Sequence, residues 1–146
     1  MVIAGIWNLR NDYLLLLGDL NGRVGKVPVH NIVGTEGETT LNNNGKRLIE
    51  FSVNNELRIT NTFFRHHNIH KFTRVVRGQT SIIDYVLANK KTWPNIKDTR
   101  VFRSGDVSSD HFIVISNINF LRRWKKLLPK TKSEGEIFKV HLLRQD

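Results

Sequence analysis

The chain has 146 residues, with 23 Lys and Arg against 13 Asp and Glu, a formal net charge of +10 at pH 7. It contains no cysteine, which excludes disulfide frameworks and thiolate zinc sites and favours a reducing compartment. The length fits one domain, no apolar run approaches the roughly 20 residues of a membrane span, and the first residues lack the basic segment of a secretory signal. The positive charge favours a polyanionic partner, with nucleic acid first among the candidates.

Residues 13–22 predict a buried strand that ends in a polar turn. Five apolar residues, 13–17, stop at a glycine and are followed by Asp19 and Asn21, a pattern typical of a strand buried on both faces. Residues two apart on an extended segment point the same way, so the carboxylate and the amide suit a water molecule or a cation. Alone, the same residues also describe an ordinary turn.

The next segments predict a loop, a helix and a strand. Residues 23–41 carry scattered Gly and Pro and indicate a long ordered loop. Residues 42–45 offer N-cap side chains for an amphipathic helix over 46–57, and 58–64 are rich in the β-branched and aromatic residues of strands. The apolar stripe of the predicted helix consists of Ile49, Val53 and Leu57, widened by Leu48 and Phe51.

Residues 65–80 are basic, with Phe72 among the cations and a turn expected at Gly78 and Gln79. Aromatic rings stack on bases and guanidinium groups pair with phosphate, so this segment suits nucleic acid. A metal site of its three histidines is disfavoured, because no carboxylate lies between them and the spacing matches no known site. The candidate nucleic-acid contacts of the chain are Arg23, Arg65, Lys71, Arg74 and Arg77.

Residues 81–88 predict a strand with Asp84 at its middle. A buried carboxylate is costly unless it is paired, so Asp84 needs a partner, or it is a structural residue that holds a loop. A short strand over 100–103 and a polar loop over 106–110 then lead to the last core strand, 111–118.

The last strand is entered through Asp110 and His111. A histidine there is a general base, a donor to phosphate, or a capping residue, and the motif alone favours capping. After residue 120 the composition becomes strongly basic, with a short amphipathic piece over 124–128. We therefore divide the chain into a domain, 1–120, and a basic tail, 121–146.

Together, three motifs in this order, residues 18–21, 81–86 and 109–111, resemble the C-terminal motifs of the endonuclease/exonuclease/phosphatase superfamily. Residues 21–25, 44–48, 60–64 and 107–112 resemble the endonuclease domains of non-LTR retrotransposons and the related craniofacial development protein 2-like sequences. The resemblance covers residues 13–125. It implies an α+β fold, the C-terminal half of a four-layer α/β/β/α (DNase I-like) sandwich, truncated at the N-terminus, because the family's Mg²⁺-binding glutamate would lie before Met1.

The resemblance also implies roles for the matching residues. Asp19 and Asn21 resemble the pair that orients or activates the attacking water, with Asp19 as base a hypothesis. His111 resembles the histidine that contacts the scissile phosphate, Asp84 the carboxylate that orients it, and Asp110 an acidic residue tied to water or metal positioning and thus the candidate metal ligand. The implied cofactor is Mg²⁺, with Mn²⁺ as the alternative.

The expected function is that of a Mg²⁺-dependent, phosphodiester-cleaving endonuclease domain of retrotransposon origin, an incomplete fragment with little or no activity alone. The alternatives are a non-catalytic nucleic-acid-binding remnant and a phosphatase of the same superfamily. Arg74 stands where related sequences tend to have Trp, which weakens the stacking role of that surface. The expected partner is DNA, with a reverse transcriptase domain or the missing N-terminal half as further candidates, no membrane, and a nuclear or cytoplasmic location.

Overall fold

The computed structural model describes residues 2–9, 13–103, 109–119 and 138–139. The predicted basic tail therefore lies outside the described residues, except for strand β9 (Phe138–Lys139), as does the predicted loop before Ser109. No helix in the described part has the length and apolar character needed to cross a bilayer.

Strand β2 (Tyr13–Asp19) lies inside an antiparallel sheet. Its neighbours are β1 (Val2–Leu9) and β6 (Asp84–Asn89), and β3 (Leu57–Ile59) follows β6 at the edge. Along β2 the buried leucines alternate between two hydrophobic clusters, with Leu16 in one and Leu15 and Leu17 in the other. The predicted strand, buried on both faces, is confirmed.

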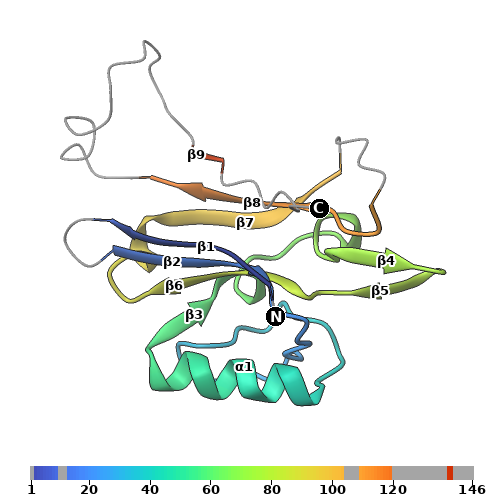
Figure 1. The fold of residues 1–146 in the computed structure, drawn as a ribbon, viewed down its shortest axis with the longest axis horizontal. Helices are drawn as coiled ribbons and strands as arrows, with labels where there is room; N and C mark the ends of the chain where they lie inside the picture. Colours follow the sequence, from blue (N-terminus) through green and yellow to red (C-terminus); the bar gives the residue numbers. More distant parts are fainter. Residues whose placement is uncertain (1, 10–12, 104–108, 120–137, 140–146) are drawn as a thin grey trace, which may run out of the picture.

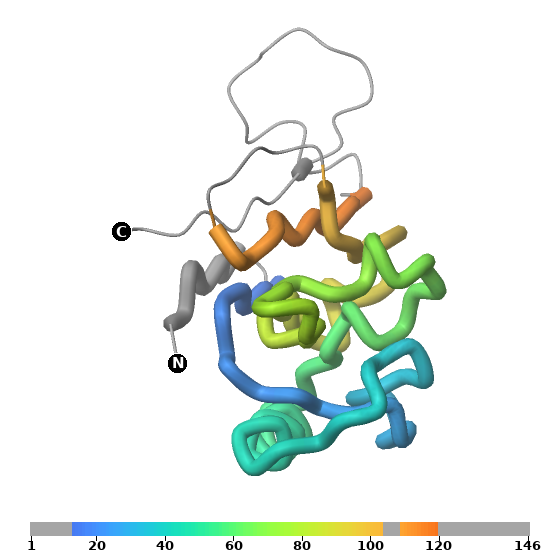
Figure 2. Tube along the Cα trace, turned by 90° about the vertical axis from the view of Figure 1, so that its right-hand side faces the viewer, coloured from blue at the N-terminus to red at the C-terminus, as the bar shows by residue number. Residues whose placement is uncertain are grey.

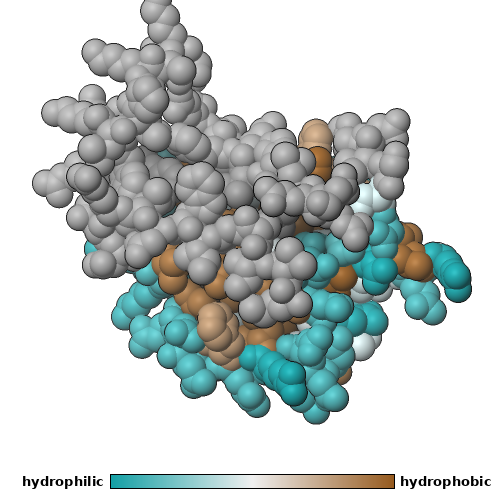
Figure 3. Space-filling model, viewed as in Figure 1, coloured by the Kyte–Doolittle hydropathy of each residue, from teal (hydrophilic) through white to brown (hydrophobic). Residues whose placement is uncertain are grey.

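The two hydrophobic clusters separate three layers (Figures 1 and 2). One cluster joins this sheet to helix α1 (Asn43–Asn54) and the loop before it. The other joins the opposite face to a second antiparallel sheet, in which β7 (Ile96–Phe102) pairs with β8 (Ile113–Ile118), and β8 pairs with β9. The mixed α+β class is confirmed, with helix, sheet and sheet in succession. Hydrophilic residues cover the surface around α1, and hydrophobic residues gather near the centre of the same view (Figure 3).

Helix α1 begins three residues before the predicted start, and its buried stripe matches the prediction in part, since Leu48 is buried and Ile49 packs against the core. Asn42 is the N-cap, and its side chain accepts a hydrogen bond from the Gly45 amide. The buried positions are Gly45, Leu48 and Ser52, whereas Phe51 and Val53 are 44% and 47% exposed. The prediction chose the more apolar stripe, but the small residues Gly45 and Ser52 are the ones that allow the helix backbone close to its neighbours. Leu57, the predicted last member of that stripe, belongs to β3.

The strand predicted over 58–64 is wrong after Ile59, where a 3-10 turn, η1 (Thr60–Thr62), replaces it. Side chains make the contacts that a longer strand would have made. The Thr60 hydroxyl donates to the Val86 carbonyl at 2.7 Å. Asn61 donates through Nδ2 to the Asp84 carbonyl at 3.1 Å and accepts from the Val86 amide through Oδ1 at 3.0 Å. The edge of β6 is thus completed by side chains.

The basic segment forms one 3-10 turn, η2 (Asn68–His70), and a hairpin. A further 3-10 turn, η3 (Trp93–Asn95), follows β6. Strands β4 (Arg74–Val76) and β5 (Gln79–Ser81) pair around Arg77 and Gly78, whose φ angles are 48° and 78°. Two consecutive positive φ angles are typical of the two-residue hairpin turn that matches strand twist. The turn therefore lies one residue earlier than predicted.

Three further strand boundaries differ from the prediction. Asp84 is the first residue of β6, so the strand predicted over 81–88 begins three residues later. His111 precedes β8, and β7 begins at Ile96 instead of at residue 100. Both acidic and imidazole groups therefore lie at strand ends, where side chains reach the rim of the sheet.

Candidate active site

The sheet places Asp19 and Asp84 directly opposite each other. Asp19 ends β2, Asp84 begins the antiparallel neighbour β6, and the two are register partners. Opposed residues of antiparallel strands project on the same face with Cβ atoms about 5 Å apart. The pairing therefore brings together two carboxylates that are 65 residues apart in sequence.

His111 reaches this rim through a third segment. The Phe112 amide donates to the Thr73 carbonyl at 2.7 Å, and His111 forms an antiparallel bridge with Arg74. His111 Nδ1 lies 3.1 and 3.2 Å from the two carboxylate oxygens of Asp84. One ligand atom each from Asp19, Asp84 and His111 lies within 4.8 Å of the others. The structure thus gives the buried Asp84 the partner that the sequence required.

Asp84 carries a cost of burial that its neighbours only partly offset. It is 6% exposed, and desolvation raises its pKa, to which the facing charge of Asp19 adds. The hydrogen bond from Thr73 and the charge and hydrogen bond of His111 act in the opposite direction on the same pKa. A carboxylate held in this way orients the ring of His111, because Nδ1 is fixed and Nε2 remains to face a ligand.

Asn21 supports Asp19 through its backbone. Its φ of 47° is in the left-handed region, where Asn is tolerated, and its amide donates to Asp19 Oδ1 at 2.9 Å. The Asn21 side chain is exposed and is available to a ligand. The Asn21 backbone amide therefore fixes one carboxylate oxygen of Asp19, and the Asn21 side-chain amide lies exposed in the same turn.

Asp110 lies beside the other three groups, and its carboxylate pairs with Arg74. Arg74 Nε lies 2.7 Å from Asp110 Oδ2, and this hydrogen bond lowers the pKa of Asp110. Asp110 Oδ1 is 4.0 Å from His111 Nε2. The described group of potential metal ligands contains Asp19, Asp84 and His111. A metal role for Asp110 stays a prediction.

The donors at this rim fit a hard divalent cation in part. Mg²⁺ is commonly held by one or two carboxylates together with waters and substrate phosphates. Asp19 and Asp84 supply two carboxylates, but Asp84 already accepts from His111. Asp19 is therefore the residue of this group best suited to hold Mg²⁺ or Mn²⁺.

The five predicted nucleic-acid contacts divide into two classes. Three are tied to carboxylates: Arg23 to Glu38, Lys71 to Glu36 at 3.1 Å, and Arg74 to Asp110. Arg65 and Arg77 are exposed. Contact with nucleic acid stays a prediction for all five. Within the described residues, Arg65 and Arg77 are the two that form no ion pair with a carboxylate.

The three loop histidines do not meet at a metal site in the described structure. His66 Nε2 lies 2.7 Å from Asp98 Oδ1, His70 Nδ1 lies 3.1 Å from the Val101 carbonyl, and His67 is exposed.

Two residues that support the rim were not singled out in the sequence. The Thr73 hydroxyl accepts from the amides of Ile83 and Asp84 at 3.0 and 3.2 Å. Glu38 is 5% exposed and accepts from Arg23 and, at 2.8 Å, from the Ile82 amide. A threonine in a basic segment and a glutamate in a glycine-rich loop give no sequence signal of such contacts.

Comparison with known proteins gives one group of relatives. The chain is similar to craniofacial development protein 2. It is 31% identical to the protein of Bos taurus and 30% identical to that of Tragulus javanicus, in each case over 122 residues, or 82% of this chain. The chain spans about a fifth of the length of these relatives, 20% and 21% respectively. No family model and no solved structure matches.

Proposed function

We propose that this chain carries part of the active site of a divalent-cation-dependent, phosphodiester-cleaving endonuclease of the endonuclease/exonuclease/phosphatase superfamily. The observation that supports this most directly is the Asp84–His111 pair at 3.1 Å, with Asp19 opposite Asp84 in register. A positioned imidazole, its orienting carboxylate and a second carboxylate are a set of groups that phosphoryl transfer uses.

Each side chain has a role in this proposal. Asp84 fixes Nδ1 of His111, so Nε2 faces the phosphate and donates to the oxygen on which charge develops. Asp19, with one oxygen held by the Asn21 amide, uses the other to orient the attacking water. Mg²⁺, when bound, would supply charge stabilisation at the phosphate oxygens.

The layering supports a DNase I-like sandwich. Helix α1, the sheet that contains β2, and the sheet that contains β7 follow one another as three successive layers of an α/β/β/α arrangement would. Only two carboxylates are grouped with His111 among the described residues, and one of them is engaged by the histidine. We therefore propose that this chain alone cleaves only slowly.

DNA is the proposed substrate, and a retrotransposon the proposed origin. The net charge of +10 supports a polyanion over a small phosphorylated substrate. A binding remnant is the second candidate, because the net charge of +10 and the exposed Arg65 and Arg77 would serve nucleic-acid binding whether or not the rim is catalytic.

A plasmid-nicking assay tests the catalytic assignment. With the chain in excess over supercoiled plasmid and Mg²⁺ present, we expect slow nicking that Asp19→Ala and His111→Ala reduce by at least about 10²-fold, as expected for loss of a preorganised group. The matched control is His67→Ala, because His67 is an exposed histidine outside this group. Equal nicking by all four proteins would overturn the assignment.

The alternatives have different readouts. Salt-sensitive DNA binding that Asp19→Ala and His111→Ala leave unchanged, without nicking, would support the binding remnant. Phosphate release from inositol phosphates without nicking would support the phosphatase.

A further inference from the structure

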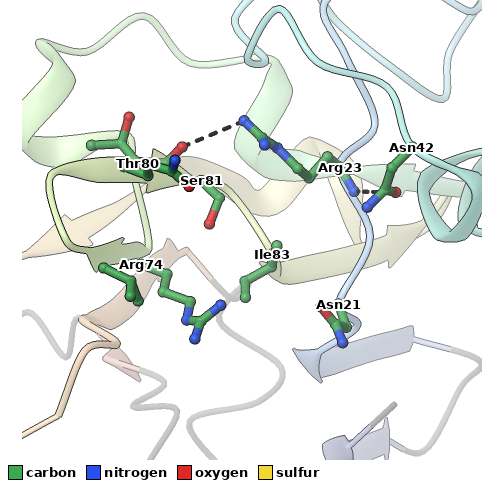
Figure 4. A pocket seen from close by; sticks show the side chains of 9 residues that line it. Asn21, Arg23, Asn42, Arg74, Thr80, Ser81 and Ile83 are labelled. Carbon is green, nitrogen blue, oxygen red and sulfur yellow. Dashed lines mark hydrogen bonds between the residues drawn. The ribbon is translucent and has the colours of Figure 1, made fainter.

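A cavity of about 170 Å³ lies beside the candidate active site. Among the described residues, its lining combines two arginines with amide and hydroxyl side chains and includes no acidic residue. Figure 4 shows these side chains coming from the turn after β2, the start of α1 and the β4–β5 hairpin. The polar lining residues that matter here are Arg23, Arg74, Asn21, Asn42, Gln79 and Ser81.

Carboxylates that do not line the cavity hold both guanidinium groups in place. Arg23 donates to Glu38 through Nε at 2.7 Å and through one terminal nitrogen, which also lies 3.4 Å from the Thr80 carbonyl. Arg74 donates to Asp110 through Nε. Each arginine therefore keeps a terminal nitrogen that is not used in these bonds, in a position already fixed by a carboxylate. A fixed donor loses less conformational entropy when it binds an anion.

The backbone around the cavity is fixed as well. Asn42 Oδ1 accepts from the amides of Arg23 at 3.0 Å and of Gly45 at 2.7 Å, which leaves Nδ2 as the donor of that side chain. A Cβ on Gly45 would collide with the Arg23 carbonyl, so the loop and the start of α1 are in close contact. The cavity is thus lined by donors that are already in place.

We propose that this cavity binds a second backbone phosphate of the nucleic acid, next to the phosphate that His111 contacts. This rests on the proposed function. Two cavity residues connect the two positions, because the Asn21 amide bonds Asp19 and Arg74 bonds Asp110, the neighbour of His111. A polynucleotide presents phosphates at such adjacent positions, whereas a free phosphate would need only one of them. The high positive charge of the chain favours the polynucleotide.

Short oligonucleotides test this proposal without catalysis. Calorimetric titrations in EDTA would compare a thymidine dinucleotide, which has one phosphodiester, with a trinucleotide, which has two. We expect the unaltered chain to bind the trinucleotide about tenfold more tightly at low salt, and Arg74→Gln to remove this difference, since one arginine–phosphate contact is lost.

The matched control is Arg47→Gln, which makes the same change in charge at an exposed residue of α1 that does not line the cavity and is not a candidate nucleic-acid contact. It should keep the difference between the two ligands, and far-UV circular dichroism would check that both variants are folded. Equal binding of both ligands by the unaltered chain, or loss of the difference in Arg47→Gln, would overturn the proposal. Inorganic phosphate binding as tightly as the trinucleotide would also overturn it, because it would indicate a site for small phosphorylated molecules.

The experiments distinguish a failure of the phosphate site from a failure of the nuclease assignment. His111→Ala should weaken both oligonucleotides and keep their ratio, because it acts at the phosphate that both ligands share. If the trinucleotide preference survives while nicking is absent, the proposed chemistry fails and the phosphate site stands.

Discussion

The two arginine–carboxylate pairs beside the cavity differ in burial and therefore in what they contribute. The Glu38 side chain is 3% exposed and also holds the Ile82 amide, whereas that of Asp110 is 34% exposed and pairs with an arginine that is 39% exposed. The first pair connects the loop, the hairpin and the approach to β6. The second lies at the surface, beside His111. A buried pair is strongly coupled to folding, while an exposed pair is screened by water.

The largest expected effect is on the buried pair. Glu38→Gln should lower the free energy of unfolding by about 2 kcal/mol, because the buried side chain loses the charge that pairs with Arg23, while Arg23, 32% exposed, stays in contact with water. Urea unfolding near neutral pH would measure the change, with Asp110→Asn as the matched control at the exposed pair. A loss no larger than that of Asp110→Asn would show that the two pairs are equivalent.

The backbone side of Arg23 offers a second test. Asn42→Ala should cost about 1–2 kcal/mol of unfolding free energy, because it removes both the helix cap and the acceptor of the Arg23 amide. Asn42→Asp keeps the oxygen and should retain most of the stability. Equal destabilisation by alanine and by aspartate would show that the stability comes from the side-chain nitrogen Nδ2 of Asn42 and not from the capping oxygen.

Asp84 extends the comparison, because its pKa is raised whereas that of Asp110 is lowered. The pKa of Asp84 is raised by burial, so its ionised form destabilises the folded state near neutral pH. Asp84→Asn should therefore increase the free energy of unfolding, by less than Asn42→Ala lowers it, while it impairs any nicking. The gain should shrink as the pH falls through the raised folded-state pKa, where the native carboxyl takes up its proton. Unfolding curves at several pH values would show this, and a gain independent of pH would contradict it.

The smallest effect is expected at the exposed pair. Asp110→Asn should cost less than about 1 kcal/mol near neutral pH. Because Arg74 lowers the pKa of Asp110, the contribution is present above the usual aspartate pKa of about 4 and is lost as the pH falls through the lowered value. The variant and the unaltered chain should therefore converge in acid, and thermal unfolding at neutral and acidic pH would detect it.

Local patterns predicted the parts of this structure that local forces determine. Five consecutive apolar residues indicated β2 with two buried faces, and Asn42, one of the four cap candidates at 42–45, is the N-cap of α1. The meeting of Asp19, Asp84 and His111 was expected from family resemblance, and the structure brings these three together.

Other features depend on contacts between distant residues and were not predictable from the sequence. Glu38 bonds a backbone amide 44 residues away, and no local pattern indicates that partner. The buried face of α1 combines Leu48 with the small residues Gly45 and Ser52, whereas a search for apolar periodicity also selected the exposed Phe51 and Val53. Close packing outweighed hydrophobicity along this helix, and a long-range hydrogen bond determined the place of Glu38.

Asn61 has a consequence for how the sheet ends. Its side chain bonds the Asp84 carbonyl and the Val86 amide, and the Thr60 hydroxyl bonds the Val86 carbonyl, beyond the point where β3 stops pairing with β6. These residues are buried, so side chains take the place of water as hydrogen-bond partners. Asn61→Ala would therefore leave a carbonyl and an amide of β6 buried without this partner, at the strand that carries Asp84 to the rim.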